Sequence, residues 1–436
     1  MAYNIVIGRD ASDKEKFGDR GLIFIGKGFV KMGNYTSLSN KIWMDVARSH
    51  IVLVAGKRGS GKSYSLGVIA EEISDLASRS SANMASIIFD TMGIFWTMKY
   101  KNEKDRELLD SWELKAKKLP VNVFVPFGKI KDYESRGIPI DKTFALKCSE
   151  LEAEDWITLF NLQMTSPAGV LIERIITELK NKEHNFTLQD IERVIEHDSK
   201  ASKETKEIAS SLFKAADTWG IFAKTEEGTE ISDLITRGTT TVLDISVYSS
   251  IGAFNIRALV ISLISRKLFK NRMDSRKKEE LEAIQHGQDY LSYKSDFSDP
   301  LVWVFIDEAH EFLPKQGKTP ATDALMQLLR EGRQPGISLV MATQQPGQIH
   351  KDVMTQSDIV ISHRVTAKPD IEALNEIMQT YLLENIKQQI DDLPSLKGSA
   401  IILDDNSERI YPMRMRPRFT WHGGEAPASI KAEMKI

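Results

Sequence analysis

The chain has 436 residues, of which 42% are apolar and 27% charged, and its formal net charge is −3. This is the profile of an ordinary soluble protein with room for one large core or two. Its single cysteine, Cys148, excludes a disulfide framework and a thiolate metal cluster. No apolar run approaches the roughly 20 residues of a membrane helix, and the first residues lack a signal-peptide pattern. We therefore expect a cytoplasmic protein without a membrane partner.

The net charge also limits how nucleic acid can be bound. A value of −3 argues against a monomer whose whole surface binds nucleic acid. It is compatible with a ring that gathers its basic groups in a pore, so charge alone does not decide the substrate.

The first 45 residues contain two strand-like pieces, Tyr3 to Ile7 and Gly21 to Phe29. The charged stretch Asp10 to Arg20 separates them. Two such pieces are too few to close a barrel by themselves.

Residues 51 to 63 carry the strongest motif. Five apolar residues, Ile51 to Ala55, predict a buried strand, and Gly56 to Ser63 fit the spacing G-x-x-x-x-G-K-[ST] ahead of a helix. Glycines let the backbone amides turn inward toward an anion, and the helix dipole adds partial positive charge there. Lys62 is expected to reach the β- and γ-phosphates, and Ser63 to place its hydroxyl on Mg²⁺. The nucleotide-binding set predicted in this way is Gly56, Gly59, Ser60, Gly61, Lys62, Ser63 and Tyr64.

Strands and helices alternate after this loop. Apolar residues at helical spacing follow it, and Ser86 to Phe89 and Val121 to Val125 then predict two more buried strands. This alternation predicts an α/β fold with a mostly parallel, doubly wound sheet. From Glu152 to Lys224 the pattern is helical, which favours an insertion. Thr239 to Ile245 restores the strand pattern, a helix follows, and the charge-dense stretch from Lys270 to Pro300 is expected to be an exposed, mobile loop.

A second chemical cluster follows the apolar strand Leu301 to Ile306. It begins with Asp307-Glu308-Ala309-His310, which fits a Walker B element. Asp307 is expected to hold Mg²⁺ through its water shell, and Glu308 to polarise the attacking water. This four-residue sequence also matches the motif of DEAH-box helicases, but no paired-arginine motif of a second RecA-like domain follows. We interpret His310 as a packing or supporting residue.

Three polar positions further along have two interpretations each. Arg333, near the end of a helix from Thr322, is either an arginine finger for a neighbouring subunit or a cation at a helix end, with Arg330 as its helper. Gln344 follows the strand Ile337 to Ala342, and either contacts the γ-phosphate or lytic water or caps a loop. Arg364 is a weaker site candidate that could instead only pair with an acid.

Together these motifs resemble the HerA branch of the HerA/FtsK superfamily of ring-forming P-loop ATPases. The resemblance rests on Ser49 to Ser65, Val302 to His310, Leu329 to Pro346 and the tail Tyr411 to Gly424, which looks like the family's C-terminal brace. It implies a RecA-like P-loop fold, the cofactors ATP and Mg²⁺, and the catalytic residues Lys62, Glu308, Arg333 and Gln344. The division of the chain that it implies is a β-rich segment (1–45), a first core part (46–150), a helical insertion (151–235), a second core part (236–405) and the brace (406–436).

The resemblance further implies a hexamer that threads double-stranded DNA beside a nuclease or other effector, in DNA-end processing or antiphage defence. Lys315 and Lys318 are possible pore lysines, although an ordinary solvated loop is an equal interpretation. An alternative function is an ATP-sensing assembly subunit that gates an effector without moving DNA. The short segment ahead of Gly56 favours this alternative, while the complete catalytic set disfavours it.

Overall fold

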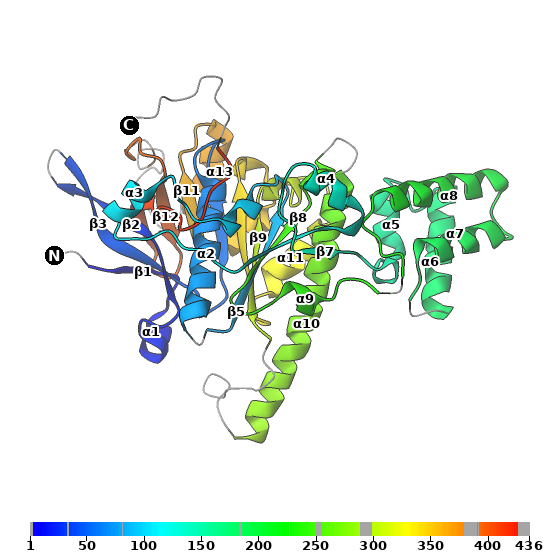
Figure 1. The fold of residues 1–436 in the computed structure, drawn as a ribbon, viewed down its shortest axis with the longest axis horizontal. Helices are drawn as coiled ribbons and strands as arrows, with labels where there is room; N and C mark the ends of the chain where they lie inside the picture. Colours follow the sequence, from blue (N-terminus) through cyan, green and yellow to red (C-terminus); the bar gives the residue numbers. More distant parts are fainter. Residues whose placement is uncertain are drawn as a thin grey trace.

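A single sheet runs through the molecule from the N-terminal hairpin to the helices at the other end (Figure 1). The computed structural model describes residues 3–32, 35–80, 82–182, 185–225, 227–249, 254–287, 299–378, 390 and 392–425. In these residues the sheet has 13 strands in the order β1-β3-β2-β13-β12-β11-β4-β10-β9-β5-β8-β6-β7. The strands are β1 (Ile5–Ile7), β2 (Leu22–Met32), β3 (Tyr35–Asp45), β4 (Ile51–Ala55), β5 (Met84–Asp90), β6 (Val121–Pro126), β7 (Lys142–Phe144), β8 (Thr240–Asp244), β9 (Leu301–Ile306), β10 (Ile337–Thr343), β11 (Ile359–His363), β12 (Ser399–Asp404) and β13 (Arg409–Met415).

Helices lie on both faces of this sheet (Figure 1). They are α1 (Ala11–Phe17), α2 (Lys62–Arg79), α3 (Arg106–Ser111), α4 (Ile130–Glu134), α5 (Ala153–Leu159), α6 (Pro167–Lys182), α7 (Leu188–His197), α8 (Lys203–Thr218), α9 (Ile231–Leu234), α10 (Phe254–Gln285), α11 (Thr322–Glu331), α12 (Lys351–Gln356) and α13 (Lys368–Met378). No helix in the described ranges is both long and apolar enough to cross a membrane.

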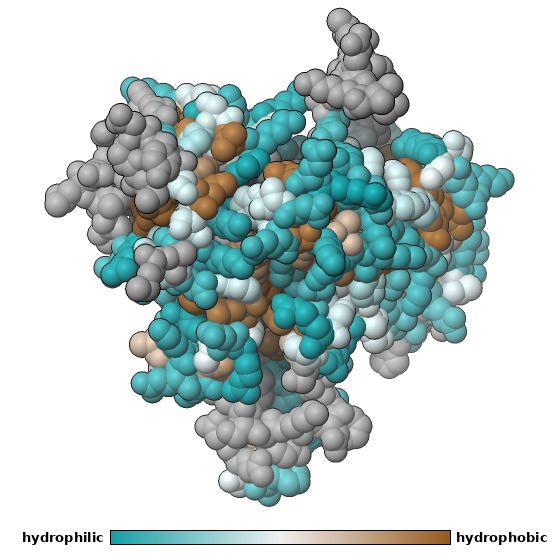
Figure 2. Space-filling view, turned by 60° about the vertical axis from the view of Figure 1, so that its left-hand side comes forward, coloured by the Kyte–Doolittle hydropathy of each residue, from teal (hydrophilic) through white to brown (hydrophobic). Residues whose placement is uncertain are grey.

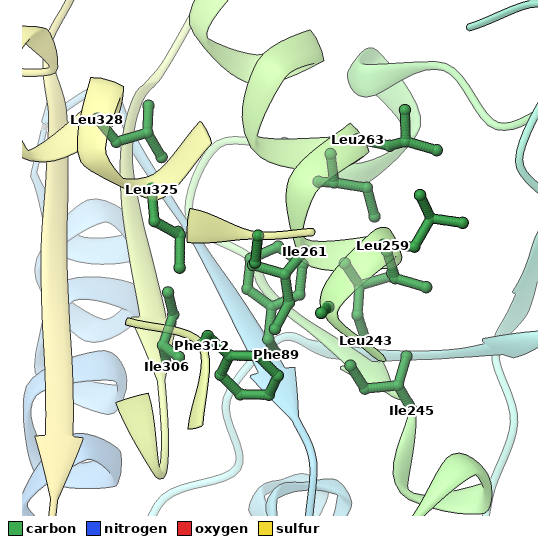
Figure 3. Close-up of a cluster of buried hydrophobic side chains, with 14 of the residues drawn as sticks. Phe89, Leu243, Ile245, Leu259, Ile261, Leu263, Ile306, Phe312, Leu325 and Leu328 are labelled. Carbon is green, nitrogen blue, oxygen red and sulfur yellow. The ribbon is translucent and has the colours of Figure 1, made fainter. Parts of the chain in front are cut away.

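The strands from β11 through β4, β10, β9 and β5 to β7 are parallel to their neighbours, so their carboxyl ends meet at one edge. Both faces are buried because alternate side chains enter different cores. In β4, Leu53 packs into the core that includes α10 and α11, whereas Val52 packs into the core that includes α2. Figure 3 shows the first core, where Phe89, Leu243 and Ile306 meet side chains of α10 and α11. The predicted doubly wound α/β fold is confirmed.

The predicted helical insertion is also confirmed, and it lies at one end of the molecule as α5 to α8 (Figure 1). Its centre is aromatic. The Trp156 ring lies 5.0 Å from the ring centroids of Phe213 and Phe222, and the Trp156 side chain is fully buried. These contacts give the insertion its own packed centre.

The prediction of a mobile loop from Lys270 was wrong. Helix α10 continues to Gln285 and extends well beyond the sheet in Figure 1. The helix forms because its polar residues find partners: Arg272 is fully buried and donates from Nε to the Pro335 carbonyl oxygen (2.9 Å) and from Nη1 to the Asp299 carbonyl oxygen (2.8 Å). Arg276 also pairs with Glu280 one turn on. Residues 288–298 of the expected loop lie outside the described residues.

Both ends of the chain extend the sheet. The sequence prediction did not include β3, which pairs with β2 as a long hairpin, or α1 in the charged stretch before it. Strand β13 joins β12 to β2, so the C-terminal segment connects the N-terminal hairpin to the core. The face in Figure 2 is largely hydrophilic, and hydrophobic residues appear mainly in recesses between hydrophilic ones.

Candidate functional site

The phosphate loop lies between the end of β4 and the start of α2, at the carboxyl edge of the sheet. Gly59 (φ +72°) and Gly61 (φ +112°) have backbone angles that other residues rarely adopt. A side chain at Gly56 would come within 2.4 Å of Ser60 Oγ, so this position needs glycine for space. Two neighbouring strands hold the loop, because the Gly56 amide donates to the Thr343 carbonyl oxygen (3.2 Å) and the Lys57 amide to that of Arg364 (3.0 Å).

The first turn of α2 meets the end of β9. Ser63 Oγ donates to Asp307 Oδ2 at 2.5 Å, which joins the two predicted Walker elements. Lys62 is buried, and its Nζ donates to the Lys57 carbonyl oxygen at 3.3 Å. Burial lowers the pKa of Lys62, against the opposing effect of the Glu308 and Asp307 carboxyl groups. A buried ammonium with one long hydrogen bond within the described residues is suited to an incoming phosphate.

Asp307 and Ser63 are suited to hold Mg²⁺. Asp307 is buried, and burial raises its pKa although the Ser63 hydroxyl and the Glu308 amide donate to its carboxylate. The described residues contain no group of three or more histidine, cysteine or acidic side chains that could hold a metal. A hydroxyl beside one carboxylate fits an ion that takes its other ligands from nucleotide oxygens and water. Such an ion would neutralise phosphate charge and polarise the phosphoryl oxygens.

Glu308 lies beside this pair with one carboxylate oxygen held and one without a hydrogen bond. Gln344 Nε2 donates to Oε1 at 2.9 Å, while Oε2 is buried and has no hydrogen-bond partner in the described part of the chain. Burial, aided by the Asp307 charge, raises the pKa of Glu308 to about 7. A carboxylate with such a pKa and one oxygen available can accept a proton from water at neutral pH.

His310 connects the strand ends rather than contacting Glu308 closely. Its Nδ1 lies 3.2 Å from Thr343 Oγ1 and 3.6 Å from Glu308 Oε2, and burial lowers its pKa. The loops after β9 and β10 are then joined directly, since the Lys315 amide donates to the Gln348 carbonyl oxygen at 2.7 Å. Between these loops lies a polar pocket of about 430 Å³, lined by His310, Pro314, Lys315, Gln316, Gln345 and Gln348.

The structure brings Lys62, Ser63, Asp307, Glu308 and Gln344 together, but it does not add the two arginines. Arg330 pairs with Asp352 (2.6 Å). Arg333 is exposed just beyond α11, and within the described residues its side chain has no hydrogen bond or ion pair. Because β10 runs from Ile337 to Thr343, Arg333 lies near its amino end and Gln344 at its carboxyl end, roughly 20 Å apart at about 3.3 Å per residue.

Sequence reasoning missed His363, which lies directly behind the phosphate loop. This fully buried ring accepts from Ser65 Oγ through Nε2 (2.8 Å) and donates from Nδ1 to the Ser399 carbonyl oxygen (3.0 Å). Burial lowers its pKa to about 4, so the ring is neutral. Its position at the end of the strand next to β4 was the available signal, but the adjacent Arg364 was chosen instead. The Arg364 side chain donates to the Leu393 carbonyl oxygen (3.3 Å).

Glu71, in the middle of α2, was also missed. It is fully buried and receives hydrogen bonds from Arg416 Nη1 (2.7 Å), the Phe419 amide (2.8 Å) and Thr420 Oγ1 (2.8 Å). The C-terminal tail is thereby fixed across the helix that begins at the phosphate loop. Periodicity offers no signal for this anchor, because the same face of α2 also carries the polar residues Ser74, Asp75 and Ser78.

The parallel sheet, the phosphate loop and the two acids at the end of β9 define a P-loop ATPase with a RecA-like core. Comparison with known proteins gives the family. Residues 30–268, more than half of the chain, match the model described as "Helicase HerA, central domain". The chain therefore belongs to the HerA family, as the motifs predicted. A second model, "Zonular occludens toxin (Zot)", matches residues 253–368.

Curated relatives carry the same family name. The "DNA double-strand break repair helicase HerA" of Pyrococcus furiosus is 28% identical over 145 residues, which cover 32% of this chain and 24% of that protein. The "Probable DNA double-strand break repair helicase HerA" of Methanocaldococcus jannaschii is 30% identical over 103 residues, covering 23% of this chain and 20% of that protein. The matches thus span about a quarter or less of these relatives.

Among the solved structures, one example has a similar overall fold. VirB4 of Thermoanaerobacter pseudethanolicus aligns with a TM-score of 0.55 over 91% of this chain and 96% of that chain, at 10% sequence identity. At this identity the likeness concerns the fold alone.

Proposed function

We propose that this chain is an ATP-hydrolysing ring motor that translocates on double-stranded DNA. The observation that carries the proposal is the contact network that joins Lys62 and Ser63 of the phosphate loop to Asp307, Glu308 and Gln344. In this network Lys62 binds the β- and γ-phosphates, Ser63 and Asp307 hold Mg²⁺, and Glu308 takes the proton of the attacking water. Gln344 orients Glu308 and contacts the γ-phosphate side of the site.

The placement of Arg333 supports a ring. Phosphoryl transfer gains from a cation near the γ-phosphate, and an arginine often supplies it from another subunit. Arg333 cannot reach the site of its own chain, because β10 separates it from Gln344. It is exposed and available to a neighbour. A homo-oligomer, a hexamer by family resemblance, places Arg333 of one subunit against the nucleotide of the next.

A coupling route from ATP to DNA begins at Glu308. Its partner Gln344 starts the loop after β10, and His310 bonds to Thr343 at the end of that strand. A change at the γ-phosphate would therefore reach both loops that border the polar pocket. Lys315 on these loops is exposed and is our choice for a DNA phosphate contact. Lys318 pairs with Asp323 (2.9 Å), which makes it the weaker choice.

Duplex DNA should therefore stimulate ATP hydrolysis, more strongly at low salt than at high salt. The measurement is the hydrolysis rate of the full chain with and without duplex DNA across a salt series. Absence of stimulation throughout the series would contradict the motor function.

The Glu308→Gln substitution distinguishes the two proposed functions, a DNA motor and an ATP-sensing subunit that gates an effector. This variant should bind ATP yet lose about 100-fold or more in hydrolysis rate, since it cannot accept the proton. Glu331→Gln, which changes an exposed acid in α11, is the matched control. A translocase with the Glu308→Gln substitution loses DNA movement, whereas a gating subunit with it still assembles and keeps its effector active. The nuclease or other effector, and a role in DNA-end processing or antiphage defence, form part of the same proposal.

A further inference from the structure

The described part of the C-terminal tail, up to residue 425, passes Tyr64, which directly follows the phosphate loop. Its hydrogen bonds to Glu71 hold Phe419 and Thr420 against the middle of α2. The Trp421 amide then donates to the Tyr100 carbonyl oxygen (2.8 Å), and Thr97 Oγ1 donates to the Trp421 carbonyl oxygen (3.2 Å). The tail is thus tied both to α2 and to the segment that follows β5.

This anchored tail places two rings together. Tyr64 directly follows Ser63, and its hydroxyl accepts from the Arg418 amide at 2.7 Å. The ring centroids of Tyr64 and His422 are 5.2 Å apart, with the rings nearly perpendicular at 79°. Successive helix residues point about 100° apart. Ser63 therefore faces Asp307 and the phosphates, while Tyr64 faces the tail.

An apolar side chain, Ile94, lies beside His422, where the tail carries a glycine. A Cβ on Gly424 would lie 3.4 Å from Ile94 Cδ1 and 2.9 Å from His422 Cε1, so the tail approaches Ile94 with a residue that has no side chain. Tyr64, Ile94 and His422 are all partly exposed. A Cβ on Gly59, at the crest of the phosphate loop, would meet no atom within 4 Å. The ring pair, which is partly exposed, and the crest of the phosphate loop, which is exposed, are therefore both accessible to a ligand.

The contact of His422 with Arg418 determines which of its ring nitrogens can donate a hydrogen bond to a ligand. Its Nδ1 lies 3.3 Å from Arg418 Nη1, and because a guanidinium only donates, Nδ1 accepts and Nε2 carries the proton. Burial and the charges of Arg418 and Lys104 lower the pKa of His422 to about 3, which keeps the ring neutral. A neutral ring with one N–H donor is a poor partner for phosphate. It suits a flat heterocycle with ring-nitrogen acceptors.

We propose that Tyr64, Ile94 and His422 bind the purine base of the nucleotide. The inference rests on the proposed function, because it takes the phosphate loop as the site of the triphosphate. The γ-phosphate lies toward Glu308 and Gln344, and the base extends from the other end of the triphosphate, past Tyr64. The His422 ring contacts the face of the base, while Ile94 covers an edge. The tail is then a part of the nucleotide site, and base recognition depends on it.

The test compares two ligands that share the phosphates but differ in the base. Binding of ATP and of inorganic tripolyphosphate, each with Mg²⁺, is measured by calorimetry on the full chain and on His422→Ala. We expect the variant to lose about tenfold in ATP affinity, the scale of one lost base–ring contact, with unchanged affinity for tripolyphosphate. His422→Phe should recover part of the loss by keeping the ring face. His197→Ala, at an exposed histidine of the insertion, is the control.

Each other outcome has a defined meaning. Equal losses for both ligands would show that His422 acts only on the shape of the phosphate loop, and no loss for either would place the base elsewhere; both overturn the inference. Thermal unfolding without ligand checks that His422→Ala remains folded, and His422→Phe gives the same comparison if it does not. If the unaltered chain bound neither ligand, the nucleotide site itself would be wrong, which is a failure of the proposed function.

Discussion

Glu308 shows how a single residue is prepared for chemistry by its surroundings. Only one of its two carboxylate oxygens has a hydrogen bond within the described residues: Gln344 donates to Oε1, while Oε2 has no partner there. Burial and Asp307 raise its pKa to about 7, whereas Lys62 and the Gln344 amide act in the opposite direction. A base works best when its pKa lies near the working pH. The same burial disfavours the charged form, so the ionised carboxylate that the proposed catalysis needs is unfavourable for folding stability.

The pH dependence of hydrolysis should report this carboxyl group. Glu308 is active when ionised, so kcat/KM for ATP should decline as the pH falls below about 7, approaching tenfold per pH unit. Gln344→Ala removes a hydrogen bond that lowers this pKa, and should move the decline to higher pH. Gln348→Ala, further along the same loop, should leave it in place. The measurement is the pH profile of initial rates, and a decline centred near the ordinary glutamate pKa of 4.5 in the unaltered chain would contradict the assignment.

At the scale of elements, His50 joins the N-terminal hairpin to the central sheet. It lies between the end of β3 and the start of β4, and is buried between two carboxylates. Its Nδ1 is 2.6 Å from Asp358 Oδ2, and its Nε2 is 3.4 Å from Asp45 Oδ2. Burial lowers the pKa of His50, but the hydrogen bonds and charges of Asp358 and Asp45 outweigh it and raise the pKa to about 9. The ring is therefore an imidazolium that ties β3 to the loop before β11.

This contact makes folding stability depend on alkaline pH. Because the folded pKa of about 9 exceeds the unfolded value of 6.5, the full stabilisation is present below pH 6.5 and is lost as the pH rises through 9. The loss amounts to roughly 3 kcal/mol at most. Urea unfolding between about pH 6 and about pH 9.5 should show it in the unaltered chain and in His197→Gln, but not in His50→Gln. A pH-independent difference between the unaltered chain and His50→Gln would contradict the ion pair.

The elements that could be predicted from the sequence are those that a contiguous pattern of residues defines. Strands β4 and β9 are apolar runs followed by motif residues, so the position of both strands was predictable, and the motif residues Ser63 and Asp307 do meet. The second half of α10 was not, because Arg272 and Ser275 look solvated in sequence but are buried against Pro335 and Asp299. His363 was missed for the same reason, since its role depends on a neighbouring strand. Such contacts join residues that are far apart in the sequence, so the spacing of apolar residues cannot reveal them.

At the scale of the whole molecule, the sheet separates two halves of one proposed site. Its carboxyl edge carries the phosphate loop, Asp307 and Glu308, while Arg333 lies near the opposite edge. A monomer of this shape has the residues for binding ATP, but its proposed arginine lies away from its own γ-phosphate. Head-to-tail association places the two edges of neighbouring subunits together, and such association closes into a ring when the rotation permits. Particle mass with and without ATP should therefore show a closed oligomer, with six subunits expected.

Mixed oligomers test whether Arg333 acts across the subunit interface. Arg333→Ala should abolish hydrolysis yet leave ATP affinity nearly unchanged, since the residue does not contact its own site. Lys62→Ala lacks a working phosphate loop but retains Arg333. In an equal mixture of the two inactive variants, about a quarter of the interfaces combine an intact loop with an intact arginine, so hydrolysis should return to a comparable fraction of the unaltered rate. Arg330→Ala in place of Arg333→Ala is the control, because Arg330 pairs with Asp352 in its own chain. If the mixture stayed inactive while its subunits exchanged, Arg333 would have only a structural role, and the catalytic cation would have to come from elsewhere.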